Sequence, residues 1–274
     1  MTNPLQQYFR QPKIFISLPS LGKYNTSESI TGDIQKMPVY GMNGADQIIA
    51  KTPDALLNGI STIKIIESCC PNIIDASKIN TIDINLILSA IRIATYGNIK
   101  SITRLCTNCN HENTYDIDIG NYIEHFKQSK FDPKIVVGDL IIMLKPLTYA
   151  QTTEFSLENF GLQKQLVQLN EIEDLDVKQT HVTRIFNEFA ALQSKVMVAS
   201  IEEIITPGSI VSEYGYIKEF IDNCDQMIIN DIRMRLDQNS QVLKTPEHQV
   251  CCENCQHIDS VELDLDQSSF FDKA

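Results

Sequence analysis

The hydrophobic pattern of the first half of the chain predicts short strands followed by helices. Residues 13–18 and 36–40 are runs rich in β-branched and aromatic side chains, which are typical of strands. Residues 52–59 open with Thr-Pro-Asp and close with glycine, so they predict a short helix with an N-cap and a stop, and residues 61–70 predict another. Residues 83–96 are apolar at helical spacing and also on the remaining sides, which predicts a helix buried all round.

The middle of the chain has a different pattern, in which one hairpin precedes helices. Residues 135–142 are apolar on both sides of Gly138 and Asp139, and this pair suits a two-residue hairpin turn. Thr148 is followed by Gln151 at the spacing of a capping box, which predicts that a helix begins there. Two β-paired segments and a helix are therefore expected after residue 134.

Two further helices are predicted beyond an acidic linker at residues 171–176. Residues 177–205 predict one long helix, which Pro207 and the glycine after it would end. Ser209 or Ser212 is the expected cap of a last helix that runs to about residue 236, with aromatic and aliphatic residues along one stripe. This region is expected to be mainly helical.

Two near copies of the pattern Cys-x-Asn-Cys-x-His lie far apart, at residues 106–111 and 252–257. Alternating apolar and polar residues flank them, for instance at residues 114–119 and 258–265. Such alternation is typical of strands, so each copy is expected at the tip of a β-hairpin. A hairpin with two cysteines at its tip is the usual half of a zinc ribbon.

The four cysteines of these patterns predict one structural zinc ion, held by Cys106, Cys109, Cys252 and Cys255. The length of chain between them is no obstacle. Closing a loop of about 145 residues rather than about 15 costs only about 2 kcal/mol more in chain entropy. A structural zinc supplies about 10–16 kcal/mol. Iron is an alternative metal that the pattern leaves open. Chance spacing of buried thiols is the competing explanation, and the repeated asparagine and histidine make it less favourable.

Other histidines and cysteines near these pairs have less specific patterns. His111 and His257 follow each pair and are interpreted as exposed hairpin residues, although a ligand or a supporting role is an alternative. Cys251 adjoins Cys252 and competes with it as a ligand, but the spacing to Cys255 favours Cys252. The other cysteines lie on apolar helical faces and are interpreted as core residues: Cys69, Cys70 and Cys224.

These patterns predict an α+β fold, in which a mixed helical body with short β-hairpins carries a composite zinc ribbon. Residues 1–98 would form an N-terminal α/β segment. Residues 99–120 and 244–266 would form the two ribbon halves. Residues 121–243 would be an inserted region made of a hairpin and helices.

Composition narrows the class of function. The chain has 274 residues, of which 43% are hydrophobic and 21% are charged, as in an ordinary globular protein. Its net charge of −12 is the opposite of a nucleic-acid-binding footprint. No apolar run is long enough to span a membrane and no N-terminal signal fits, so a reducing cytoplasm is expected. There, paired cysteines indicate metal rather than disulfides.

Catalysis has little support in the sequence. Phosphate-binding glycine loops and the His-Glu-x-x-His zinc motif are absent, and no carboxylate pair stands out as an acid and base. Four thiolates would close the zinc shell, whereas a catalytic zinc keeps a position for water. A redox enzyme that uses the cysteine pairs remains an alternative, as does a zinc-ribbon regulator that binds nucleic acid. No small-molecule substrate is expected.

Five segments together resemble a known family. They are residues 11–22, 37–40, 51–59, 83–97 and 106–109. In order and spacing they are similar to the opening of the T-even-type bacteriophage baseplate hub assembly proteins. The resemblance covers residues 8–120 well and the second cysteine pair more loosely.

The resemblance implies a non-enzymatic role in building the central hub of a phage tail baseplate, as an assembly chaperone or a minor hub component. It implies phage baseplate proteins as partners, the host cytoplasm during assembly as the location, and the virion tail as a further location. The candidate partner surfaces are residues 9–22 and the long helices of the second half. The apolar strand near the N-terminus needs a sheet or a partner with which to pair.

Overall fold

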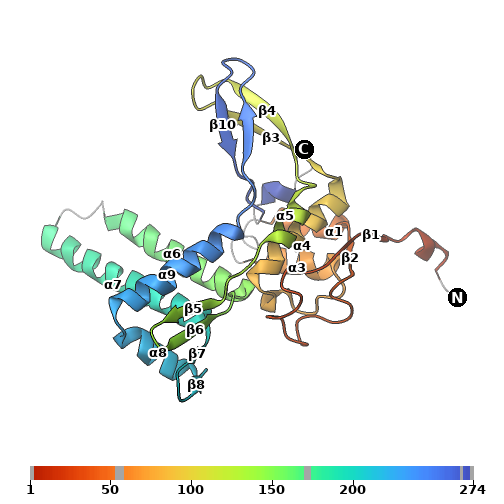
Figure 1. Ribbon diagram of the computed structural model, residues 1–274. Helices are drawn as coiled ribbons and strands as arrows, with labels where there is room; N and C mark the ends of the chain where they lie inside the picture. Colours follow the sequence, from red (N-terminus) through yellow and green to blue (C-terminus); the bar gives the residue numbers. More distant parts are fainter. Residues whose placement is uncertain (1–2, 53–58, 170–173, 266–267, 272–274) are drawn as a thin grey trace. The chain divides into compact units, whose positions relative to one another are not determined.

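The computed structural model describes residues 3–52, 59–169, 174–265 and 268–271 (Figure 1). These residues form eight α-helices and small antiparallel sheets, so the expected mixed α/β class is confirmed. The chain divides into two units. Unit 1 contains Met1–Ser129 and Leu243–Ala274, and unit 2 contains Lys130–Val242. Unit 2 is therefore inserted into the sequence of unit 1.

Unit 1 combines a helical body with three strand pairs. Its helices are α1 (Gly44–Ala50), α3 (Ile60–Cys69), α4 (Thr81–Tyr96), α5 (Tyr122–Gln128) and the 3-10 helices η1 (Pro4–Tyr8), η2 (Ala76–Lys78) and η4 (Ser268–Phe271). Its strands are β1 (Pro12–Ile16), β2 (Met37–Tyr40), β3 (Ile99–Leu105), β4 (Glu112–Asp118), β9 (His248–Cys251) and β10 (Ile258–Val261). The pairs β1–β2, β3–β4 and β9–β10 are all antiparallel.

Helix α4 is the buried centre of unit 1, as its pattern predicts. The Asn80 side chain caps its start and Gly97, with φ of 86°, ends it. A buried carboxylate, Asp83, accepts hydrogen bonds from the Ser20 amide (2.9 Å), the Ser20 hydroxyl (2.6 Å) and the Asn25 amide group (2.7 Å). These bonds attach the loop after β1 to α4. Burial raises the pKa of Asp83, and the hydrogen bonds oppose this shift.

Before α4, the helix predicted at residues 61–70 is confirmed as α3, but the rest of this region differs from the sequence prediction. Helix α1 was not predicted, although Asn43 and Asp46 form a capping box at its start. Of the helix expected at residues 52–59, residues 53–58 lie outside the described residues. Gly59 is the N-cap of α3, with φ of 66°, so it begins a helix there.

Unit 2 is built on a four-stranded antiparallel sheet. Its strands are β5 (Lys134–Val137), β6 (Leu140–Leu144), β7 (Ile201–Ile205) and β8 (Ile210–Val211), in the order β5-β6-β7-β8. Its helices are α6 (Tyr149–Gln168), α7 (Leu175–Ser200), α8 (Tyr214–Asn223) and α9 (Gln226–Val242). The predicted turn at Gly138, with φ of 57°, and the predicted capping box at Thr148 are both confirmed.

The predicted long helix at residues 177–205 is wrong at its C-terminal end. Helix α7 stops at Ser200, and Ile201–Ile205 is strand β7, because its backbone pairs with β6 on one side and β8 on the other. The predicted last helix is also wrong in its extent. It is two helices, α8 and α9, with a break at Cys224 and Asp225, and Glu213 rather than a serine is the N-cap residue of α8. Of the predicted acidic linker, residues 171–173 lie outside the described residues, and Asp174 caps α7.

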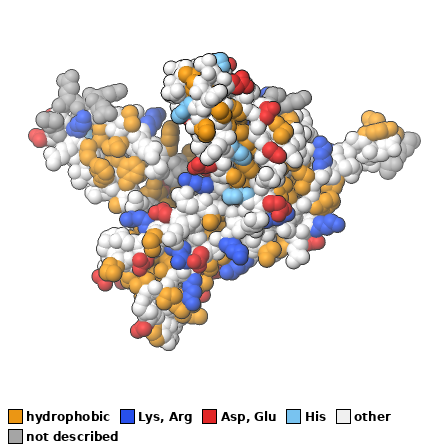
Figure 2. Space-filling view, turned by 45° about the horizontal axis from the view of Figure 1, so that its top comes forward, with side chains coloured by type: hydrophobic (Ala, Val, Ile, Leu, Met, Phe, Trp, Pro, Cys, Tyr) orange, Lys and Arg blue, Asp and Glu red, His pale blue; other side chains and the backbone are white. Residues whose placement is uncertain are grey.

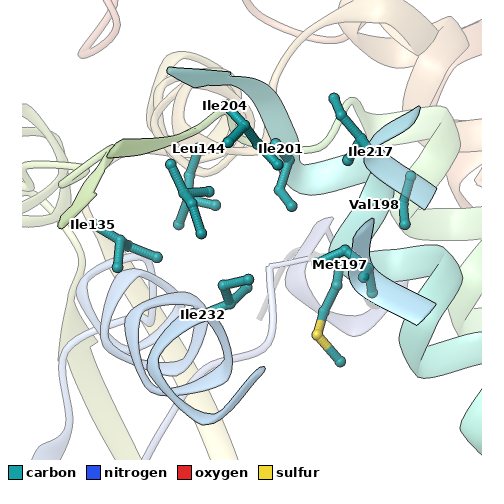
Figure 3. Close-up of a cluster of buried hydrophobic side chains, with 10 residues drawn as sticks. Ile135, Leu144, Met197, Val198, Ile201, Ile204, Ile217 and Ile232 are labelled. Carbon is teal, nitrogen blue, oxygen red and sulfur yellow. The ribbon is translucent and has the colours of Figure 1, made fainter. Parts of the chain in front are cut away.

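The main core of unit 2 lies on one face of its sheet. Figure 3 shows the labelled aliphatic side chains from the strands and from helices α7, α8 and α9 pointing toward one another. Ile142, Leu144 and Ile232 are fully buried there. Ile142 and Leu144 are alternate residues of β6, as the period of two along a strand requires. In β7 the core residues Ile201 and Ile204 are three apart, because the register between β6 and β7 shifts at Met143 and Leu144.

Candidate metal centre

Two hairpins of unit 1 lie side by side and carry the paired cysteines at their turns (Figure 1). In the first hairpin, Leu105 is the last residue of β3 and pairs with Glu112 of β4. In the second, Cys251 of β9 pairs with Ile258 of β10. Each turn therefore spans the six residues of one Cys-x-Asn-Cys-x-His pattern, which explains why the two copies match over that length.

The structure brings together all four cysteines that the sequence predicts as ligands. One sulfur atom from each of Cys106, Cys109, Cys252 and Cys255 lies within 4.8 Å of the others. The Cys106 and Cys255 sulfurs are 3.6 Å apart, and the Cys109 and Cys252 sulfurs are 3.7 Å apart. A tetrahedron of sulfurs about 2.3 Å from a zinc ion has edges of about 3.8 Å. The cluster therefore fits a tetrahedral zinc shell.

The two turns have the same backbone conformation. The Cys106 amide donates to the His111 carbonyl and the Cys252 amide donates to the His257 carbonyl, each at 2.9 Å. The residue after the second cysteine of each turn has a left-handed backbone, with φ of 55° at Asn110 and 58° at Gln256. The shared histidine position thus closes each turn through its backbone carbonyl, a bond that does not depend on the imidazole side chain.

The shared asparagines reach across to the opposite turn. Asn108 of the first turn donates to the Cys255 sulfur at 3.6 Å, and Asn254 of the second donates to the Cys109 sulfur at 3.7 Å. Each asparagine thus supports a sulfur of the other hairpin, and the two bonds are related by the approximate symmetry of the site. Both asparagines are part of the sequence repeat, but the sequence alone does not assign them a role.

A third asparagine, Asn113 of β4, is a site residue that the sequence analysis missed. Its side chain is buried, donates to the Cys252 sulfur at 3.5 Å and accepts from the Glu253 amide at 3.0 Å. It therefore joins the first hairpin to the second turn. Asp259 occupies the matching position of the second hairpin and accepts from the Thr107 amide at 3.4 Å. Because an aspartate stands there instead of an asparagine, the sequence repeat gives no signal for Asn113.

Hydrogen bonds to the sulfurs favour the thiolate form in the second turn. Backbone amides of Cys255 and Asn254, together with the Asn113 side chain, lower the pKa of Cys252 to about 6. The His257 amide and the Asn108 side chain lower the pKa of Cys255. Thiolates are the metal-binding form of cysteine, so these two residues are prepared for a cation.

The pKa of Cys106 shifts in the opposite direction, upward. The Cys109 amide hydrogen bond lowers its pKa, but burial and the neighbouring Cys255 and Cys252 sulfurs outweigh this effect and raise the pKa to about 11. Sulfurs this close compete for the negative charge when they share no cation. A divalent ion would remove the competition because it stabilises thiolates on both turns.

The remaining histidines and cysteines lie outside this cluster. His111, His257 and Cys251 are exposed, and the His257 ring lies 3.5 Å from Asp259. The Asp259 carboxylate accepts a 2.6 Å hydrogen bond from Thr107, which links the two hairpins again. Of the predicted core cysteines, two are fully buried and the third is half-buried: Cys69, Cys70 and Cys224.

The fold and this cluster define a mixed α/β protein whose two distant hairpins meet at a four-cysteine site. A family described as T4 bacteriophage base plate protein matches residues 12–272. The match spans nearly the whole chain, so the chain belongs to this family of phage baseplate proteins, and the resemblance to a T4-type baseplate family is confirmed. Curated proteins and solved structures give no significant match.

Proposed function

We propose that this chain acts, without catalysing a reaction, in the assembly of the central hub of a phage tail baseplate. It serves there as an assembly chaperone or as a minor hub component. Membership of the baseplate family over residues 12–272 is the observation that carries the proposal. Its partners are other baseplate proteins, and it works in the host cytoplasm during assembly and in the tail if it stays in the particle.

A structural zinc ion bound by the four cysteines is part of this proposal. The carrying observation is that sulfurs from Cys106, Cys109, Cys252 and Cys255 lie within 4.8 Å of one another. Four sulfur ligands fill a tetrahedral shell and leave no position for a water molecule, which is the arrangement of structural sites. The ion would fasten residues 99–118 to residues 248–261 and so hold together the sequence segments on either side of unit 2.

The hairpins β3–β4 and β9–β10, which we call the ribbon, have a surface that favours a protein partner over nucleic acid. Exposed carboxylates lie along β4 and after β10, and the whole chain has a net charge of −12. A zinc ribbon that binds nucleic acid would need a basic face to contact the phosphates. No described helix has the length and apolar character needed to cross a membrane.

Exposed apolar side chains supply candidate partner surfaces in both units. In the N-terminal region they include Phe9 and Phe15, with 57% and 51% of their surface exposed. Helices α6 and α7 expose others, and Figure 2 shows hydrophobic side chains gathered on the left, where this helix pair lies in Figure 1. The large exposed apolar residues described in α6 and α7 are Leu157, Phe160, Val167, Val177 and Phe186. Patches of this kind are typical of protein interaction sites.

Quantitative mass spectrometry of purified virions and of infected-cell lysate tests the role. A hub component is expected in both samples at a fixed ratio to other baseplate proteins, and a chaperone only in the lysate, in complex with hub precursors. Absence from virions together with absence of any complex with baseplate proteins would contradict the proposal. The same samples from phage with Cys252→Ser should contain fewer complete baseplates, whereas the neighbouring Cys251→Ser serves as the matched control.

A further inference from the structure

The unit 2 sheet has a second face that the core does not use. Ile135 of β5 and Ile204 of β7 point into the main core between the sheet and helices α7, α8 and α9 (Figure 3), and Ile142 of β6 belongs to the same buried cluster. Successive residues of a strand point to opposite faces. The neighbours of these residues along each strand therefore lie on the other face of the sheet. Among the described residues of unit 2, none of those on this outer face belongs to the main core cluster.

An unbroken row of branched aliphatic residues crosses this outer face. Val136 of β5 pairs with Ile141 of β6, Ile141 pairs with Ile205 of β7, and Ile205 pairs with Ile210 of β8. We call these four residues the aliphatic row. Its ends are open, with 62% of Val136 and 64% of Ile210 exposed, and its two middle residues are half-buried.

The next row on the same face is mixed. Met143 of β6 lies between Lys134 of β5 and Glu203 of β7, its two register partners. A positive and a negative side chain therefore flank the apolar surface beside the aliphatic row. Any segment that covers this face meets an apolar strip first and charges of both signs next to it.

The sequence of β6 is typical of a strand that is buried on both faces of its sheet. Its five residues, Leu-Ile-Ile-Met-Leu, include no polar side chain. A strand with one face in water usually alternates apolar with polar residues, whereas continuous apolar runs are typical of strands buried on both faces. Helices already cover the inner face, so a helix on the outer face would complete a three-layer arrangement.

We propose that the aliphatic row binds an amphipathic helix of another baseplate protein. The helix would place its apolar stripe on the row and its charged residues beside Lys134 and Glu203. This inference rests on the proposed function, because that function supplies the other baseplate proteins. It adds the outer face of the sheet to the candidate partner surfaces of unit 2.

The size of the surface favours a helix over a second copy of the chain. Four strands about 4.8 Å apart make a row about 15 Å long. One such row offers a small part of the roughly 800 Å² that each partner of a stable dimer usually buries. A single helix needs less area, and helix-in-groove recognition rests on a few apolar anchors at spacings of three and four residues.

Photo-crosslinking tests the inference with the full chain during phage infection. The photoreactive residue p-benzoylphenylalanine replaces Val136 in one variant and Ile210 in another, and crosslinked peptides are identified by mass spectrometry. Both positions are expected to crosslink to one segment of another baseplate protein, at residues three, four or seven apart. Adding Ile210→Glu to the Val136 variant should lower the yield about tenfold or more, because a charge would be buried against the apolar stripe.

Met227→Glu is the matched control, because Met227 is an apolar residue of unit 2 with 78% of its surface exposed and lies outside the row. This change should leave the Val136 crosslink yield unaltered. Circular dichroism checks that the variants fold, and Ile210→Lys repeats the test with the opposite charge. Crosslinks to a second copy of the chain, or at alternate residues of a partner strand, would overturn the inference.

The two proposals can fail separately. If the chain is recovered with baseplate proteins but neither position crosslinks, the aliphatic row is not the binding surface and the proposed function stands. If the chain is recovered with no baseplate protein, the proposed function fails and this inference fails with it.

Discussion

The ribbon of unit 1 and the core of unit 2 are held together by different chemistry. In unit 2, ten buried apolar residues from strands and helices form one cluster. In the ribbon, most residues of β3 and β4 are exposed or half-buried, and the side chains that meet at the turns are cysteines. Burial stabilises unit 2 directly. The ribbon depends on the ion that its sulfurs are proposed to bind, so the two regions should respond to different perturbations.

Removing the proposed zinc ion should have the largest effect and should act on the ribbon alone. A structural zinc contributes about 10–16 kcal/mol to a small site. A strong chelator is therefore expected to abolish hydrogen-exchange protection in residues 99–118 and 248–261. Strands β6 and β7 should keep their protection. Hydrogen exchange followed by mass spectrometry makes this comparison.

Cys252→Ser should reproduce the effect of the chelator, and Cys251→Ser, at an exposed position outside the cluster, is the matched control. His111→Ala and His257→Ala should also keep the metal. Equal loss of metal in the Cys251 variant would show that the ligand set is assigned wrongly.

A cavity in the unit 2 core should produce the second-largest effect and leave the ribbon intact. Leu144 is fully buried, and replacing it with alanine should lower the free energy of unfolding of unit 2 by about 2–5 kcal/mol. Urea denaturation measures this loss, and the metal content of the variant should equal that of the unaltered chain. Val167→Ala, at a residue with 67% of its surface exposed, should stay within about 0.5 kcal/mol.

Asn108 and Asn254, which each donate to a sulfur of the opposite turn, allow the two halves of the ribbon to be compared with each other. Asn108→Ala and Asn254→Ala each remove one hydrogen bond to a sulfur and should weaken zinc binding about 10–100-fold. Competition with a coloured chelator gives the affinities. The two single variants should lose similar amounts because the site is nearly symmetric. A large loss in one and none in the other would contradict the paired roles.

A smaller, pH-dependent effect is expected at the base of the second hairpin. Burial lowers the pKa of His248 below 6.5, and its ring nitrogen lies 2.8 Å from the Tyr122 hydroxyl, with the two rings stacked. The unfolded chain therefore binds a proton at this histidine more readily than the folded chain does. Stability from the neutral histidine is present above pH 6.5 and is lost as the pH falls from 6.5 through the folded-state pKa.

Urea denaturation at pH 7.5 and 5.5 tests this sign. The unaltered chain should lose more stability on acidification than His248→Gln does, and the difference isolates the histidine from the acid sensitivity of the cysteine site. An equal loss of stability in both proteins would show that His248 does not contribute to the pH dependence.

The sequence predicts the ribbon better than it predicts unit 2. Each Cys-x-Asn-Cys-x-His turn is a local pattern, and its spacing alone sets two sulfurs on one turn. The buried helix α4 is equally local, since its apolar residues and its caps lie within residues 80–97. Asn113 escapes prediction because its role depends on a contact with a residue far away in sequence, Cys252.

Strand β7 shows why the rest of unit 2 was harder. Residues 201–205 continue directly from helix α7, with no glycine or proline between them. Their isoleucines fit a helix pattern as well as a strand, and only pairing with β6 and β8 selects the strand. The break at Cys224 and Asp225 between α8 and α9 is likewise unmarked by glycine or proline.

X-ray absorption spectroscopy of the purified chain, together with its metal content, tests the central claim most directly. The account predicts one zinc ion per chain with four sulfur neighbours at about 2.3 Å. A chain purified without chelators that holds no metal would contradict it, as would a metal ion whose neighbours include nitrogen or oxygen.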